Sequence, residues 1–118
     1  DFAAGESPVI ETPDQLIDAL TAGIAIETGP FAARTRARYA LFIEGAGDAD
    51  LLAPLLAQRA VFVAFTVNLL AAVGARSPEA AARTLMAASD GLVLHRVTID
   101  PDAEIRPVIE RAVRACLD

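Results

Sequence analysis

The sequence holds few residues of the kinds that perform chemistry, and their spacing argues against catalysis. The chain has a single His, His95, and a single Cys, Cys116, which together cannot form a soft metal site. Residue 92, three positions before His95, is Leu, so the Glu-x-x-His pair of a di-iron bundle is missing. The sequence also lacks a nucleophile elbow and a glycine-rich phosphate loop. We therefore predict that the chain is not an enzyme and needs no metal or cofactor.

Asp90 is the most unusual charged residue, because apolar side chains flank it in the sequence. A carboxylate in such a place has to be paired or has to face water. We expect it to pair with an arginine such as Arg38 or Arg59, and a hydrogen bond to a ligand is the alternative. His95 would lie about 140° around a helix from Asp90. The two residues therefore form no dyad, and we expect His95 at an interface or on the surface.

Two polar residues interrupt the most apolar stretch of the chain, residues 60–75. They are Thr66 and Asn68. In the structural interpretation, Thr66 bonds its own backbone and Asn68 bridges helices or faces solvent. In the functional interpretation, Asn68 is the polar anchor of a mostly apolar small-molecule pocket, beside Phe62, Phe65 and Leu69.

Aromatic and basic side chains alternate in a second segment. Tyr39 and Phe42 are three residues apart and share a helical face, where either core packing or pocket lining would suit them. Arg34 and Arg38 share another face, and Arg36 lies between them. We interpret the three arginines as a solvated face that balances nearby acidic groups.

Helix start and stop signals divide the chain into five predicted helices and give no sign of strands. Thr12-Pro13-Asp14-Gln15 has the pattern of a capping box, and Ser77-Pro78 and Asp100-Pro101 repeat the start signal. Pro107 leaves two options for the last helix, which either begins near Glu104 or is kinked. The fold class we predict is an all-α, five-helix bundle. Its helices span roughly residues 13–28, 31 or 32–44, 50–73, 78–99 and a last segment that ends at 117, after a frayed remnant or linker at 1–11.

Composition restricts the environment and the partners. The 118 residues fit one domain, and 54 % of them are hydrophobic. All ten basic residues are Arg, and with sixteen acidic residues the net charge is -6, which makes the chain a poor nucleic-acid binder. The uncharged stretch at 60–75 is shorter than the ~20 residues of a membrane span, so we expect a buried core helix there and no membrane association. No signal peptide is visible, and we expect a cytoplasmic location.

The fourth predicted helix is apolar nearly all round, which is more surface than five helices can cover. The fifth is amphipathic, and Cys116 in its apolar stripe should pack as a small hydrophobe. We therefore predict a homodimer formed through the last two helices. The residues expected at this interface are Thr84, Ala87, Ala88, Gly91, Leu92, His95, Ile105, Val108, Ile109, Ala112, Val113 and Cys116.

Several segments together resemble the C-terminal half of a TetR-family transcriptional regulator, over roughly residues 12–117. They are RARYALFIEGA at 36–46, the long helix at 51–74, SPEAAAR at 77–83, DGLVLHR at 90–96 and Ile-Arg-Pro at 105–107. The resemblance implies an all-helical domain whose last two helices form a four-helix bundle with a second subunit. It also implies that the preceding helices enclose an effector pocket, and that the effector changes the spacing of two DNA-binding heads. The helix-turn-helix head itself has no counterpart in this sequence.

The expected function is therefore that of the regulatory domain of a TetR-like repressor. It would bind an unidentified small apolar or amphipathic molecule and control operator binding by the missing head, while this fragment itself binds no nucleic acid. The alternative is a helical homodimerisation module without an effector. The candidate ligand-binding residues are Tyr39, Phe42, Phe62, Phe65, Asn68, Leu69, Met86 and Asp90.

Overall fold

The computed structural model describes residues 9–117, and within them it contains five α-helices and no strand. The predicted all-α class and the number of helices are confirmed. Most of the predicted N-terminal remnant, residues 1–8, lies outside the described residues. The helices are α1 (Pro13–Thr28), α2 (Ala32–Glu44), α3 (Ala49–Ala72), α4 (Pro78–Thr98) and α5 (Arg106–Ala115).

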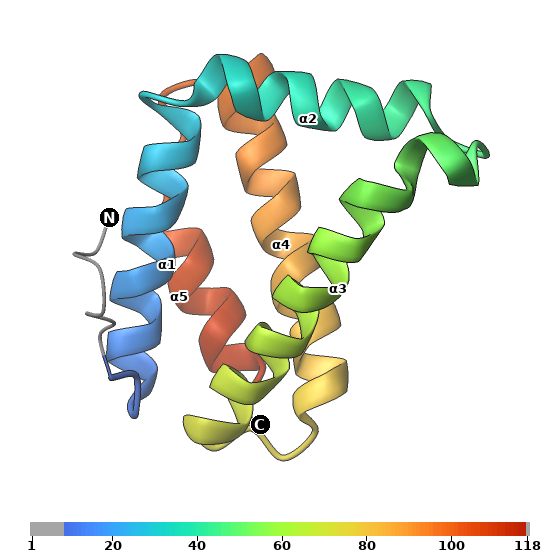
Figure 1. Ribbon diagram of the computed structural model, residues 1–118. Helices are drawn as coiled ribbons and strands as arrows, with labels where there is room; N and C mark the ends of the chain where they lie inside the picture. Colours follow the sequence, from blue (N-terminus) through green and yellow to red (C-terminus); the bar gives the residue numbers. More distant parts are fainter. Residues whose placement is uncertain (1–8, 118) are drawn as a thin grey trace.

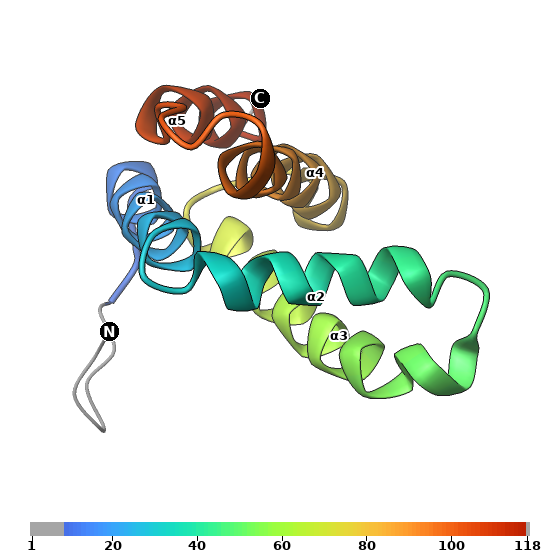
Figure 2. The same ribbon diagram turned by 90° about the horizontal axis from the view of Figure 1, so that it is seen from above.

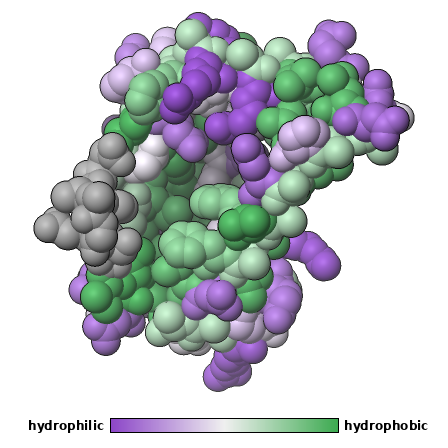
Figure 3. Space-filling model, viewed as in Figure 1, coloured by the Kyte–Doolittle hydropathy of each residue, from purple (hydrophilic) through white to green (hydrophobic). Residues whose placement is uncertain are grey.

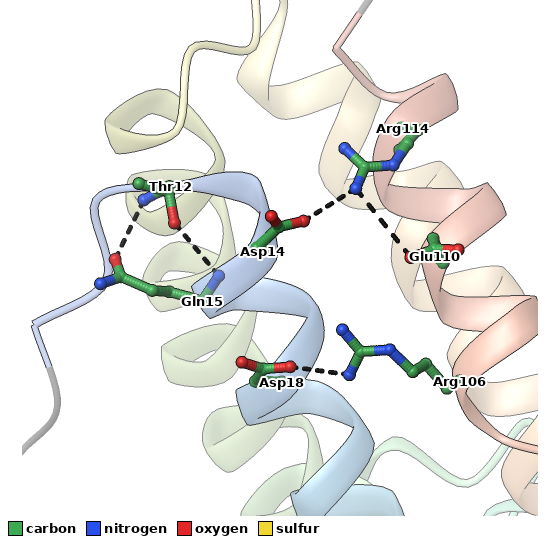
Figure 4. Close-up of polar contacts among 7 residues, drawn as sticks. All are labelled: Thr12, Asp14, Gln15, Asp18, Arg106, Glu110 and Arg114. Carbon is green, nitrogen blue, oxygen red and sulfur yellow. Dashed lines mark hydrogen bonds and ion pairs between the residues drawn. The ribbon is translucent and has the colours of Figure 1, made fainter.

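The start of α1 forms as its sequence predicts. The Gln15 backbone N–H donates to Thr12 Oγ1 at 3.2 Å, and the Gln15 side chain accepts from the Thr12 N–H at 3.1 Å (Figure 4). These two bonds satisfy N–H groups that have no partner inside the helix. The last helix begins at Arg106, so Pro107 lies in its first turn, where its missing N–H costs nothing. Of the two predicted options, the structure therefore has the one in which the helix begins shortly before Pro107 and is not kinked there.

The helix α4 is the centre of the domain, because it packs against each of the other four. Helices α1, α4 and α5 lie side by side, α2 crosses the end formed by α1 and α4, and α3 returns diagonally across α4 (Figures 1 and 2). The large apolar side chains that are almost completely inaccessible come from four helices, so one core joins them. These residues are Leu16, Ile17, Leu70, Leu85, Ile109 and Val113.

The helix α3 is less covered than its sequence suggests. Only Leu52, Thr66 and Leu70 of its 24 residues are buried, and the exposed fraction is 50 % for Phe62 and 55 % for Phe65. Among the described helices, α3 is the one that is long and apolar enough by itself to cross a membrane, judged by length and composition. The prediction of a buried core helix at residues 60–75 is therefore wrong for the single chain. Helical periodicity shows which face is apolar but not how much of that face a neighbour covers.

An arginine joins the end of α1 to the connection between α4 and α5. Arg96 Nε donates to Thr28 Oγ1 at 2.8 Å, and Arg96 NH1 donates to the Ala103 carbonyl oxygen. Thr28 in turn donates to the Ile24 carbonyl oxygen at 2.7 Å. Thr28 is buried, so this guanidinium supplies polar contacts that water cannot replace there.

Two further bonds hold α2 across this end of the domain. Thr35 Oγ1 donates to the Glu27 carbonyl oxygen at 2.7 Å, which joins α2 to the end of α1. Arg36 NH1 donates to the Val97 carbonyl oxygen at 3.0 Å, which joins α2 to the end of α4. We call these bonds and the Arg96 contacts, which involve Thr28, Thr35, Arg36 and Arg96, the polar junction.

Ion pairs along α1 and α5 complete the frame. Arg106 contacts Asp18 at 2.7 Å and Arg114 contacts Asp14 at 2.8 Å (Figure 4). All four side chains are about half exposed or more, so solvent screens the attraction within each pair. The pairs therefore fix how α5 lies along α1 more than they stabilise the core.

We expect the Arg96→Met substitution to lower the free energy of unfolding by about 1–3 kcal/mol, because it leaves the Thr28 hydroxyl and the Ala103 carbonyl without their donor. Urea unfolding followed by far-UV circular dichroism measures the change. Arg111→Met, at an exposed position of α5, is the matched control and should change the value by less than about 0.5 kcal/mol. Equal losses in the two variants would contradict the role given to Arg96.

Candidate functional site

Three side chains from three different helices meet beside the core. Tyr39 of α2 donates its hydroxyl hydrogen to Asp90 Oδ1 of α4 at 2.8 Å. Arg59 of α3 donates from NH1 to Asp90 Oδ2 at 3.4 Å. We call Tyr39, Arg59 and Asp90 the polar cluster. Asp90 thus pairs with Arg59, one of the two arginines that the sequence suggested, whereas Arg38 lies 4.0 Å from Glu27.

The local sequence explains why these side chains point toward α4. Arg59 stands midway between Leu52 and Thr66, seven residues from each, and both of these residues are buried. A spacing of seven residues returns to nearly the same helical face. Tyr39 is four residues after Thr35, the one buried residue of α2. Helix α2 therefore presents Tyr39, and α3 presents Arg59, on the face that contacts α4.

The cluster is partly open to water, and its members are not equally buried. The side chains of Arg59 and Asp90 keep 44 % and 40 % of their surface exposed, so this pair contributes at most ~1 kcal/mol. Burial raises the pKa of Tyr39 above its ordinary value, and the hydrogen bond and charge of Asp90 raise it further, while Arg38 acts in the opposite direction. The Tyr39–Asp90 bond is thus the firm part of the cluster, and the Arg59 contact is the part that a ligand could displace.

An open groove of about 400 Å³ lies between α2 and α4 and begins at the cluster. Tyr39 belongs to both, and Leu94 of the groove is one helical turn after Asp90. Most of the lining is apolar. The lining residues are Arg36, Ala37, Tyr39, Ala40, Ile43, Leu94 and Thr98.

The predicted ligand-binding residues do not all gather at this place. The structure brings Tyr39 and Asp90 together, and it places Phe42 half-buried, three residues after Tyr39. Met86 is buried, and Leu69 is half-buried against the core. The remaining three residues, Phe62, Phe65 and Asn68, are exposed on α3.

Asn68 lies on the solvent side of α3. Thr66, two residues earlier and about 160° around the helix, is buried and donates to the Phe62 carbonyl oxygen at 2.8 Å. This self-bonded threonine matches the structural interpretation of the sequence. Figure 3 shows hydrophobic side chains gathered over α3 and a hollow in the surface between α1, α2 and α3.

Sequence reasoning named Arg59 only as an ion-pair partner and assigned to a site none of the groove residues other than Tyr39. The unassigned residues are Arg36, Ala37, Ala40, Ile43, Leu94 and Thr98. Ile43 and Leu94 each follow a cluster residue by four positions, which is one helical turn, but this spacing points to a groove only once the contact between Tyr39 and Asp90 is known. Arg59 is also the only basic residue in α3. Within residues 9–117, no group of three or more His, Cys, Asp or Glu side chains is placed to hold a metal ion.

The twelve residues expected at the interface divide into two groups. Leu92, Ile109, Val113 and Cys116 are buried in the core of the single chain, and Cys116 Sγ donates to the Ala81 carbonyl oxygen at 3.3 Å. The others are exposed or half-exposed, and an added Cβ at Gly91 would meet no atom within 4 Å. We call the exposed group the small-residue face. It consists of Thr84, Ala87, Ala88, Gly91 and His95 of α4 with Ile105, Val108 and Ala112 near and in α5.

A shallow hollow of about 190 Å³ lies near one end of this face, between the start of α4 and the end of α5. Ala80, Thr84 and Ala115 line it, so its walls are small side chains. The hollow and the face together present little bulk along α4. Such a surface allows another helix to approach closely.

Tyr39 can be observed directly, because it is the only Tyr and the chain has no Trp. In an absorbance titration of the folded chain, we expect Tyr39 to ionise above the ordinary tyrosine pKa of about 10. Asp90→Asn should lower this pKa, because it removes the carboxylate that accepts the hydrogen bond and repels the phenolate. An identical pKa in the two proteins would contradict the role of Asp90.

The same shift has a consequence for stability at high pH. Above pH ~10 the unfolded chain loses the proton of Tyr39, whereas the native chain retains it because its pKa is higher. The contribution of Tyr39 to the free energy of unfolding is therefore complete below pH ~10 and is lost as the pH rises further. Tyr39→Phe should remove that part of the decline in the free energy of unfolding. Burial also raises the pKa of Cys116, but Cys116 is present in both proteins and its contribution cancels in the comparison.

Comparison with known proteins identifies one family. Residues 11–118 match the family described as "Tetracyclin repressor-like, C-terminal domain". Searches of curated proteins and of solved structures gave no significant match. The family match spans all five helices, the polar cluster and the small-residue face. The chain therefore belongs to the tetracyclin repressor-like C-terminal domain family.

Proposed function

We propose that this chain is the effector-binding and dimerisation domain of a TetR-like transcriptional repressor in the cytoplasm. It binds a small apolar or amphipathic molecule and thereby controls DNA binding by an N-terminal head. The family to which the chain belongs supports a regulatory rather than a catalytic role. The observation that carries the proposal is the apolar groove that ends at the polar cluster.

The groove has the size and composition of a small-molecule site. Its volume of about 400 Å³ falls in the range of ~300–1,000 Å³ that ligand pockets occupy. Such pockets combine mostly apolar walls with a few polar groups that orient the ligand. Here Tyr39 supplies a polar group that Asp90 holds in place through its hydrogen bond, and Ile43 and Leu94 supply part of the walls.

The position of α2 links ligand binding to a conformational change. This helix buries only Thr35 and is held to α1 and α4 mainly through the polar junction. A ligand between α2 and α4 would favour the arrangements in which the groove is open. A shift of this equilibrium changes DNA binding if a head contacts α1 or α2, which is the coupling expected of an allosteric domain.

Dimerisation uses the small-residue face in this proposal. A two-fold axis would place α4 and α5 of one subunit against the same helices of the other, forming a four-helix bundle. Small side chains at Ala87 and Gly91 allow the two α4 helices to come close. The buried residues Ile109 and Val113 would support this face from inside the subunit.

We expect Ala87→Glu to convert the dimer into a monomer, because it places two carboxylates in a close helix contact. Sedimentation velocity at micromolar concentration measures the change. Ala22→Glu introduces the same group at an exposed position of α1 and should leave the dimer intact. A wild-type chain that sediments as a monomer would overturn this part of the proposal.

A thermal-shift screen of apolar and amphipathic molecules tests the effector. At least one compound should raise the midpoint of unfolding, because a ligand that binds only the folded chain stabilises it. Leu94→Ser, in the groove, should reduce the shift, whereas Asn68→Ala, on the solvent side of α3, should leave it unchanged. If no compound shifts the midpoint, the homodimerisation module without an effector is the correct alternative.

A further inference from the structure

We infer that the ligand of this domain is an anionic amphiphile, a monocarboxylate whose head binds Arg59 and whose apolar body lies in the groove between α2 and α4. The inference rests on the proposed function and specifies the chemical class of the effector. It follows from the unused hydrogen-bonding capacity of the polar cluster and from the charges around it.

Arg59 has more donors than its contacts in the structure use. Its guanidinium carries five N–H donors, yet the contacts to Asp90 involve a single oxygen, Oδ2, at 3.4 Å. The side chain is 44 % exposed, so a ligand can reach it. A second carboxylate can therefore bind Arg59 through two parallel hydrogen bonds while the Asp90 contact persists or loosens.

Asp90 has less free hydrogen-bonding capacity for a cationic ligand than Arg59 has for an anionic ligand. Its Oδ1 accepts the hydrogen bond of Tyr39 at 2.8 Å, and its Oδ2 faces Arg59. Each oxygen thus accepts from one donor of the protein and keeps further lone-pair capacity. Arg59 has more free N–H donors than Asp90 has free acceptor sites, which favours a ligand with acceptor atoms.

The charges around Tyr39 favour the same class of ligand. The Arg38 guanidinium lies 5.4 Å from the centre of the Tyr39 ring, and Arg36 lines the groove. With Arg59, these are three cations against the carboxylates of Asp90 and Glu27. This region therefore has one more positive than negative charge among these five residues, on a chain whose net charge is -6. Such a region attracts small anions that the rest of the surface repels.

The apolar part of the ligand has a place next to this head group. Ile43, which is 67 % exposed, and Leu94 follow Tyr39 and Asp90 by one helical turn and line the groove. A hydrocarbon chain or an aromatic ring that covers them removes apolar surface from water. Tyr39 lines the groove, and Asp90 links it to Arg59, so the head group at Arg59 would lie next to the Tyr39 end of the groove.

Three probes with the same ten-carbon tail test the head group, namely decanoate, decyltrimethylammonium and decanol. Titration calorimetry of the 118-residue chain at neutral pH and micromolar protein gives their dissociation constants. We expect decanoate to bind at least about tenfold more tightly than the other two, which is the effect of a charge-assisted hydrogen bond pair.

Two variants separate a ligand contact from a merely structural ion pair. Arg59→Gln should weaken decanoate binding about tenfold or more, because it removes the cation. Asp90→Asn should strengthen decanoate binding, because it removes a like charge and releases Arg59. A structural role of the pair would instead weaken binding in both variants. Arg111→Gln makes the same change in net charge on α5 and should leave decanoate binding unchanged, and circular dichroism confirms that each variant is folded.

A preference for decyltrimethylammonium or decanol would overturn the inference, and so would unchanged decanoate binding by a folded Arg59→Gln variant. Both results leave the effector-binding function in place. Failure of all three probes also overturns the inference, and the thermal-shift screen then decides about the function separately. Compounds that shift the midpoint would show that another class of ligand binds, whereas a screen without any shift would refute effector binding itself.

Discussion

The hydrogen bonds of Arg96 are the constraint on which the arrangement of the other helices depends. This one guanidinium binds the buried hydroxyl of Thr28 and the carbonyl oxygen of Ala103, so it fixes the end of α1 and the connection into α5 relative to α4. The corner between α1 and α2 is set in the same place, because Thr35 bonds the backbone of α1. Packing alone would not hold α2, since it buries one residue.

The domain thus combines a firm part with a loosely held part. Helices α1, α4 and α5 supply most of the buried side chains. Helix α2 and the first two turns of α3 bury little and are held by a few polar contacts. Elements with few buried contacts open at low free energy, and ligand-binding elements are commonly of this kind. The polar cluster lies at the boundary of the two parts, which is where the proposed effector would change the balance between them.

The same boundary explains the charge pattern. An acidic chain without lysine places three of its ten arginines in α2 and a fourth alone on α3. Arg36 and Arg38 hold backbone or carboxylate oxygens, and Arg59 contacts Asp90 only through one oxygen at 3.4 Å. Arginine is the residue whose planar donors suit carboxylates. Arginine therefore has a structural role at the polar junction, and at the cluster it is the proposed partner of the ligand.

The sequence by itself determined the five helices, the capping box at Thr12 and the need of Asp90 for a partner. These are local properties, since capping boxes, prolines and the 3.6-residue period act within a few residues of the chain. The start signal predicted at Asp100-Pro101 was wrong, because α5 begins only at Arg106. Only the tertiary structure decided which arginine Asp90 contacts and that Asn68 faces solvent. It also decided which of the predicted interface residues are buried within the subunit, such as Ile109 and Val113, and which remain accessible, such as Ala87 and Gly91. The groove was equally beyond the sequence, because it is made by two helices that are about fifty residues apart. Periodicity marks the apolar face of each helix, but the neighbour that covers this face is chosen by how all five helices pack.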